Sequence, residues 1–80
     1  MILPTKHTNF SESLLGFGSY ILSNLKQPKS IDELWEQYHK DYENKIYYAK
    51  QSLDNLFLTI IFLYSIGIVY EKDGVIAKCT

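Results

Sequence analysis

The chain has 80 residues and a formal net charge of −1, from nine acidic and eight basic side chains. This length allows one small domain, and the near-neutral charge gives no electrostatic reason to expect a nucleic-acid partner. All the basic residues are lysines, and arginine, the commonest side chain that reads guanine, does not occur in the sequence. The composition therefore counts against sequence-specific DNA binding, although lysines remain able to contact a phosphate backbone.

Nothing in the sequence indicates secretion or a membrane span. Cys79 is the single cysteine, so no intrachain disulfide is expected. The start has no basic segment followed by an apolar run, which predicts no signal peptide. The longest nearly continuous apolar run, residues 56–70, is shorter than the roughly 20 residues that a spanning helix needs. We therefore expect a cytoplasmic protein.

The first ten residues contain Pro4 and several turn-forming side chains but no hydrophobic period, which predicts an N-terminal arm over 1–10 and a single domain over 11–80. A helix is expected from Ser11 or Ser13 to about Leu25. Its predicted apolar face consists of Leu14, Leu15, Gly18, Ile21, Leu22 and Leu25. Because Gly16 and Gly18 each cost about 1 kcal/mol in a helix relative to alanine, we expect another helix to approach closely there.

The second predicted helix runs from Ile31 to about Tyr42 and is introduced by the capping-box pattern of Ser30 and Glu33. Its spacing predicts a solvated face that includes Asp41. Its predicted buried face consists of Ile31, Leu34, Trp35, Tyr38 and Tyr42. The following segment, residues 43–51, mixes strand-forming and helix-forming side chains and is predicted to be an irregular link.

The third predicted helix, residues 53–66, is apolar nearly all round. Ser52 is suited to cap it and Gly67 to end it. One apolar face, predicted to be in the core, consists of Leu53, Leu56, Phe57, Ile60, Leu63 and Tyr64; the other carries Leu58, Ile61, Phe62 and Ile66. A domain this small cannot bury a helix on every side, so the second face is expected to contact another chain.

Two β-rich runs, 68–70 and 75–77, flank a turn that contains Asp73 and Gly74, which predicts a hairpin. Three helices followed by a hairpin predict a mainly α (α+β) winged helix-turn-helix domain with a C-terminal β-hairpin wing. No catalytic, cofactor-binding or metal-binding set is predicted, because His7, His39 and Cys79 have no partners at suitable spacing. We therefore expect a protein that is not an enzyme.

In a DNA-binding winged helix, polar and basic side chains on the third helix enter the major groove. Leu58, Ile61 and Phe62 cannot pair with the groove's donors and acceptors, so this face is predicted to be covered by the arm and wing or to bind protein. The predicted protein interface consists of Leu58, Ile61, Phe62 and Ile66, together with Ile2 and Leu3 of the arm. The alternative is a DNA-binding regulator whose contacts are Lys45, Lys50, Lys72 and Lys78.

Two motifs resemble those of a known family. They are Ile2-Leu3-Pro4-Thr5-Lys6-His7, followed by Ser11-Glu12-Ser13-Leu14-Leu15-Gly16-Phe17-Gly18, and Leu63-Tyr64-Ser65-Ile66-Gly67-Ile68-Val69. The chain resembles the small, winged-helix middle component of bacterial ABC-three-component (Lamassu-like) systems. The resemblance implies a non-catalytic adaptor in an anti-phage or anti-plasmid defence complex. Its implied partners are an SMC/Rad50-like ABC ATPase and an effector, often a nuclease, with DNA contacted at most through the complex. Apart from the resemblance, the apolar face of the third predicted helix leaves open a homodimer of the isolated chain.

Overall fold

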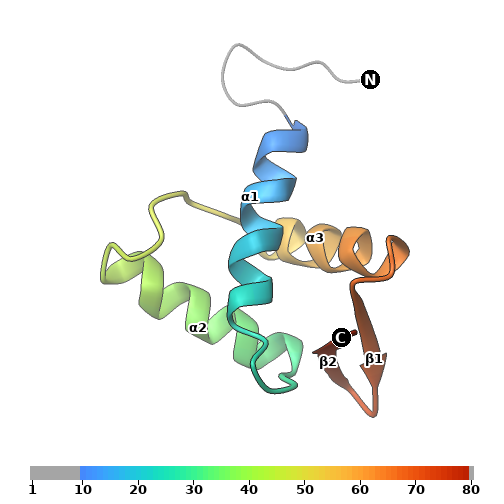
Figure 1. Ribbon diagram of the computed structural model, residues 1–80. Coiled ribbons are helices and arrows are strands. Elements are labelled where there is room, and N and C mark those ends of the chain that lie inside the picture. Colours follow the sequence, from blue (N-terminus) through green and yellow to red (C-terminus); the bar gives the residue numbers. More distant parts are fainter. Residues whose placement is uncertain (1–9, 80) are drawn as a thin grey trace.

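The computed structural model describes residues 10–79, with side chains described from Leu14 onward. Three helices are followed by a β-hairpin: α1 covers Phe10–Ser23, α2 Ile31–Glu43, α3 Leu53–Ser65, β1 Val69–Lys72 and β2 Val75–Lys78. In Figure 1, α1 crosses α3, while α2 and the hairpin lie toward the opposite end of α1 from its N-terminus. The predicted three-helix α+β layout with a hairpin wing is confirmed. Ile2, Leu3 and most of the predicted arm lie outside the described residues, so the domain boundary stays a prediction.

The wing is an antiparallel two-stranded sheet in which Glu71 pairs with Ile76. Asp73 and Gly74 form its turn with φ values of 55° and 83°, as a two-residue hairpin turn with two left-handed positions requires. The outer edge of β2 pairs with the segment between α1 and α2. There, the Lys29 N–H donates to the Ile76 carbonyl (3.0 Å) and the Ile76 N–H donates to the Lys29 carbonyl (2.7 Å). This bridge ties the wing to the helical part of the chain.

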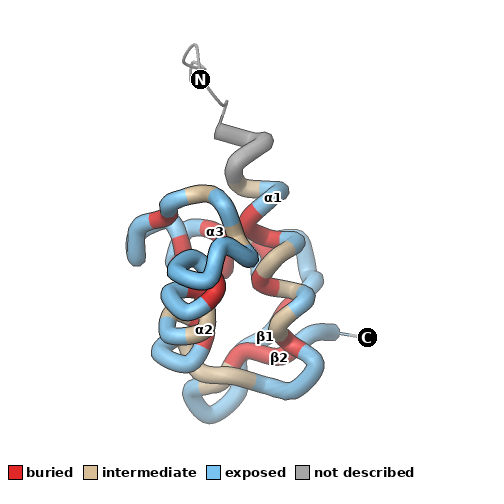
Figure 2. The backbone as a smooth tube through the Cα atoms, turned by 90° about the vertical axis from the view of Figure 1, so that its left-hand side faces the viewer, coloured by how far each residue is buried: buried red, intermediate tan, exposed pale blue. Residues whose placement is uncertain are grey.

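The core lies where the three helices and the wing meet, as the buried positions in Figure 2 show. Helix α2 has the predicted capping box, with the Ser30 hydroxyl accepting from the Glu33 N–H and the Glu33 carboxylate accepting from the Ser30 N–H. The predicted irregular link after α2 is also confirmed, since no helix or strand lies between Glu43 and Leu53. The fully buried apolar core consists of Phe17, Ile21, Leu25, Leu34, Tyr38, Leu56, Ile60, Leu63, Val69 and Ile76.

Two predictions for α2 were wrong. Tyr42 is 36% exposed and so does not belong to the core. Asp41, predicted to be solvated, is buried because both of its carboxylate oxygens are hydrogen-bonded. The Tyr20 hydroxyl donates to Oδ2 (2.5 Å) and the Gln37 amide to Oδ1 (3.0 Å). Burial and the bond to Asp41 raise the pKa of Tyr20 well above the ordinary tyrosine value, so the hydroxyl keeps its proton to higher pH than an exposed tyrosine does.

The orientation of α3 also differs from the prediction. Its buried stripe consists of Leu56, Thr59, Ile60 and Leu63, whereas Leu53, Phe57 and Tyr64, which were predicted to lie in the core, are exposed. The cause is the small side chain of Thr59. Its hydroxyl donates to the Asn55 carbonyl within the helix (2.7 Å), which leaves its methyl group free to pack against α1. The helix is therefore rotated so that α1 covers Thr59 instead of Phe57.

The crossing of α1 and α3 confirms the predicted close approach at Gly18, but the same prediction for Gly16 was wrong, since a Cβ atom there would meet no described atom within 4 Å. A Cβ atom at Gly18 would lie 3.4 Å from Leu63 Cδ2 and 3.6 Å from Thr59 Cγ2. Phe17, which the helical pattern did not place on the buried face, is 1% exposed, whereas Leu15 is 59% exposed. The contact face of α1 is thus turned toward Phe17 relative to the prediction.

We expect Gly16→Ala to raise the free energy of unfolding by about 0.5–1 kcal/mol, because alanine favours the helix and a Cβ atom there meets nothing within 4 Å among the described residues. Gly18→Ala is also expected to be tolerated, since its Cβ atom would lie in van der Waals contact with Leu63 and Thr59. Urea denaturation of both variants measures the free energies of unfolding. A marked loss of stability in Gly18→Ala would contradict the packing described for the crossing.

Tyr38 fixes the link between α2 and α3. Its hydroxyl accepts from the Gln51 N–H (2.6 Å) and donates to the Ala49 carbonyl (3.1 Å), and both Tyr38 and Gln51 are buried. Tyr38→Phe should lower the free energy of unfolding by about 1–3 kcal/mol, because it leaves the buried Gln51 N–H without a partner. Tyr42→Phe is the matched control, expected to change stability by less than about 0.5 kcal/mol. Equal costs in urea denaturation would show that the Tyr38 hydroxyl does not hold the link.

Candidate interaction surface

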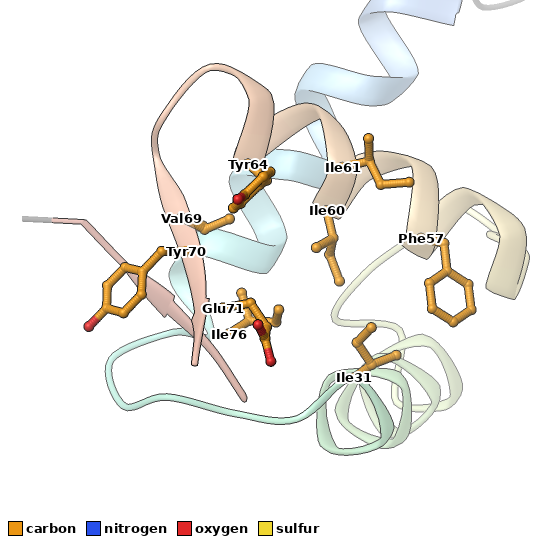
Figure 3. Close-up of a pocket in the computed structure, with 9 residues that line it drawn as sticks. All are labelled: Ile31, Phe57, Ile60, Ile61, Tyr64, Val69, Tyr70, Glu71 and Ile76. Carbon is orange, nitrogen blue, oxygen red and sulfur yellow. The ribbon is translucent and has the colours of Figure 1, made fainter. Parts of the chain in front are cut away.

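An apolar groove of about 270 Å³ lies between α3 and the wing. We call it the α3–wing groove. Figure 3 shows it bordered by α3, by the hairpin and by the start of α2. Its floor contains Ile60, Val69 and Ile76, which belong to the core. The nine residues that line it are Ile31, Phe57, Ile60, Ile61, Tyr64, Val69, Tyr70, Glu71 and Ile76.

The outer border of the groove is formed by large apolar and aromatic side chains that are open to solvent. Phe57 is 43% exposed, Ile61 61%, Tyr64 61% and Tyr70 44%. Phe57, Ile61 and Tyr64 are spaced by four and three residues, so they form one stripe along α3. This stripe faces away from α1, which covers Thr59 and Leu63 instead. The described residues therefore leave one side of α3 apolar and uncovered.

The predicted interface residues do not all lie together. Ile61 lines the groove. Leu58, at 39% exposure, and Ile66, at 52%, are accessible but do not line it. Phe62 is half-buried and packs against the core, so it is partly a structural residue. Ile2 and Leu3 lie outside the described residues. Whether any of these six side chains binds a partner stays a prediction.

Sequence reasoning missed Phe57, Tyr64, Tyr70 and Glu71 as groove residues. The first two were assigned to the core because they follow the same helical spacing as Leu56 and Ile60. Two adjacent apolar stripes on one helix cannot be told apart by period alone. Gly18 could have indicated the observed orientation of α3. A glycine in α1 predicts a close contact with another helix, and a small side chain such as Thr59 is suited to pack against it.

The four lysines of the predicted DNA-binding alternative are exposed but are spread over separate elements. Lys45 follows α2 and Lys50 lies in the link before α3. Lys72 and Lys78 stand at opposite ends of the hairpin ladder, since Lys72 pairs with Val75 and Lys78 with Val69. None of them lines the α3–wing groove. A DNA-binding winged helix inserts the exposed side of its third helix into the major groove. Here that side of α3 carries apolar side chains and none of these four lysines.

Other chemistry-bearing side chains form no site in the described part of the chain. His39 is exposed and packs edge-on against the Trp35 ring, with centroids 4.5 Å apart. No group of three or more His, Cys, Asp or Glu side chains suited to hold a metal ion was found among the described residues. Across residues 10–79, no helix combines the length and apolarity needed to cross a membrane.

Comparison with known proteins assigns the chain to a family. The family model described as ABC-three component (ABC-3C) system Middle Component 6 matches residues 3–79 and so covers nearly the whole chain. Searches of curated proteins and of solved structures found no match. The family resemblance inferred from the N-terminal and C-terminal motifs is thereby confirmed. The chain therefore belongs to the Middle Component 6 family of ABC-three-component systems and is an accessory component of such a system.

Proposed function

We propose that this chain is a non-catalytic adaptor that binds the ABC ATPase component of its system through the α3–wing groove and links it to the effector. The observation that supports this most directly is the uncovered stripe of Phe57, Ile61 and Tyr64 beside Tyr70. Large aromatic and branched apolar side chains of this kind are typical of the buried centre of protein interfaces. A small domain that exposes such a stripe gains stability when a partner covers it.

The finer identity of the partners follows from the family resemblance. We propose an ATPase of the SMC/Rad50 type and an effector that is often a nuclease, within a Lamassu-type anti-phage or anti-plasmid defence complex in the cytoplasm. The adaptor itself needs no cofactor in this scheme. Its proposed contribution is the apolar surface of the α3–wing groove.

The test is reconstitution of the system from purified components. The full chain is mixed with the recombinant ATPase component alone, with the effector alone, and with both, and each mixture is analysed by size-exclusion chromatography with light scattering. We expect a stable complex with the ATPase that also recruits the effector. Failure of the chain to co-elute with the ATPase would overturn the proposal. Binding of the chain alone to duplex DNA, weakening steeply with salt, would instead support the DNA-binding regulator.

A further inference from the structure

The α3–wing groove carries one charged side chain, which indicates the chemistry of its occupant. Glu71 is the only charged residue among the nine that line the groove. It lies opposite Ile76 in the hairpin, so both side chains project from the same face of the wing, and Figure 3 shows them side by side. Glu71 Oε2 accepts the Gly74 N–H at 2.8 Å. This bond fixes the carboxylate at the border of an apolar surface.

Two further exposed carboxylates, Asp54 and Asp32, stand near lining residues in the sequence, but neither lines the groove itself. Asp54 is exposed and precedes Phe57 by three residues and Ile61 by seven, which places it on the groove side of α3. Asp32 is exposed and follows Ile31 in the first turn of α2. Lys72 projects from the opposite face of β1 to Glu71, because neighbouring residues of a strand alternate. Lys78, opposite Val69, and Lys29, opposite Ile76, share the face of Glu71, but neither lines the groove.

We propose that the groove receives a bulky apolar side chain of the ATPase component that is flanked by a lysine or arginine, and that this cation pairs with Glu71. This inference rests on the proposed adaptor function. The groove, with a volume of about 270 Å³, has room for one bulky apolar side chain. An apolar anchor in a pocket with a complementary charge at its border is how many protein interfaces gain both affinity and specificity.

The first test uses two synthetic helical peptides with the same pattern of leucines, one with lysine and one with glutamate at the remaining positions. Each is titrated into the full, isotope-labelled chain and followed by NMR. We expect the lysine peptide to shift the amide signals of Phe57, Ile61, Tyr64 and Glu71, and the glutamate peptide to leave them unchanged at the same concentration. Equal effects of both peptides, or shifts confined to other surfaces, would overturn the proposal.

The second test is Glu71→Gln, which removes the charge but keeps an oxygen to accept the Gly74 N–H. We expect affinity for the lysine peptide and for the ATPase component to fall about 5–10-fold at low salt, and the salt dependence of binding to become weaker. Glu36→Gln, at an exposed position of α2, is the control for the change in net charge and should bind like the wild type.

The outcomes separate this proposal from the adaptor function. If Glu71→Gln binds the ATPase like the wild type while Ile61→Asp does not, the groove remains the proposed ATPase interface. The proposal that a lysine or arginine of the partner pairs with Glu71 is then wrong. If the free chain self-associates and Ile61→Asp abolishes this self-association, the occupant of the groove is a second copy of the chain. The double variant Ile2→Asp, Leu3→Asp tests whether the chain's own N-terminal segment is the occupant. If it is, the full chain with both substitutions should bind the lysine peptide more tightly than the wild type does.

Discussion

Replacing Ile61 by aspartate is expected to abolish co-elution of the chain with its ATPase component while leaving the chain folded. Ile61 lines the α3–wing groove and is 61% exposed, so the folded monomer can hold a carboxylate there at little cost. In a complex the same position becomes buried. Loss of the apolar contact costs roughly 1.5–3 kcal/mol, or about 10–150-fold in affinity, and an unpaired buried carboxylate adds to this. Isothermal titration calorimetry measures the loss, and a thermal melt checks the fold.

Ile46→Asp is the matched control for this experiment. It makes the same chemical change at a residue that is 70% exposed and lies in the link after α2, away from the groove. The control should bind the ATPase like the wild type. Equal losses in both variants would indicate a general effect of charge, and wild-type binding by Ile61→Asp would exclude the groove as the interface. Phe62 is unsuitable for this test because its side chain packs against the core.

Replacing Leu56 by alanine is expected to lower the free energy of unfolding by about 2–5 kcal/mol. Leu56 is 0% exposed in the core shared by the helices and the wing, so the substitution leaves a cavity that rigid neighbours fill only partly. A domain of this length has a total stability of roughly 4–12 kcal/mol. The variant should therefore melt at least about 8 °C lower, and at the upper end of the range it should be largely unfolded.

Leu53→Ala, one turn earlier in α3, is the control for the change in helix propensity. Leu53 is 41% exposed, and its truncation should cost less than about 1 kcal/mol because no core cavity forms. Urea denaturation of both variants gives the two free energies. Similar losses in the free energy of unfolding for the two variants would contradict the orientation of α3. They would indicate that Leu53 lies in the core, as its helical spacing predicted.

The helices and the wing could be predicted because their ends carry local chemical signals. Ser30 with Glu33 marks the start of α2, Ser52 the start of α3, and Asp73-Gly74 the hairpin turn; all three are observed. Each signal acts within a few residues and needs no knowledge of distant partners. The family motifs likewise identified the family from short stretches of sequence.

The rotation of each helix about its axis could not be predicted in the same way. It depends on which residue of another helix arrives opposite, as at Gly18 and Thr59, and that contact is long-range. When a helix has two neighbouring apolar stripes, its own sequence does not show which of them faces the core. For the same reason the burial of Asp41 was missed, since its partner Tyr20 lies on another helix. The fold class could therefore be predicted from the sequence, whereas only Ile61 of the nine groove residues had been predicted to lie at an interface.

The bridge between Lys29 and Ile76 has a consequence for regulation. It places the wing beside the start of α2, so the groove is assembled from Ile31, α3 and the hairpin, which are far apart in the chain. Only the complete native state presents this surface, and a partner that binds there adds stability by mass action, about 2.7 kcal/mol at a hundredfold excess over its dissociation constant. Under the proposed adaptor function, the unassembled chain would be the less stable species and the preferred substrate of cellular proteases. Subunit balance in the system would in this way be maintained by selective degradation of the unassembled chain.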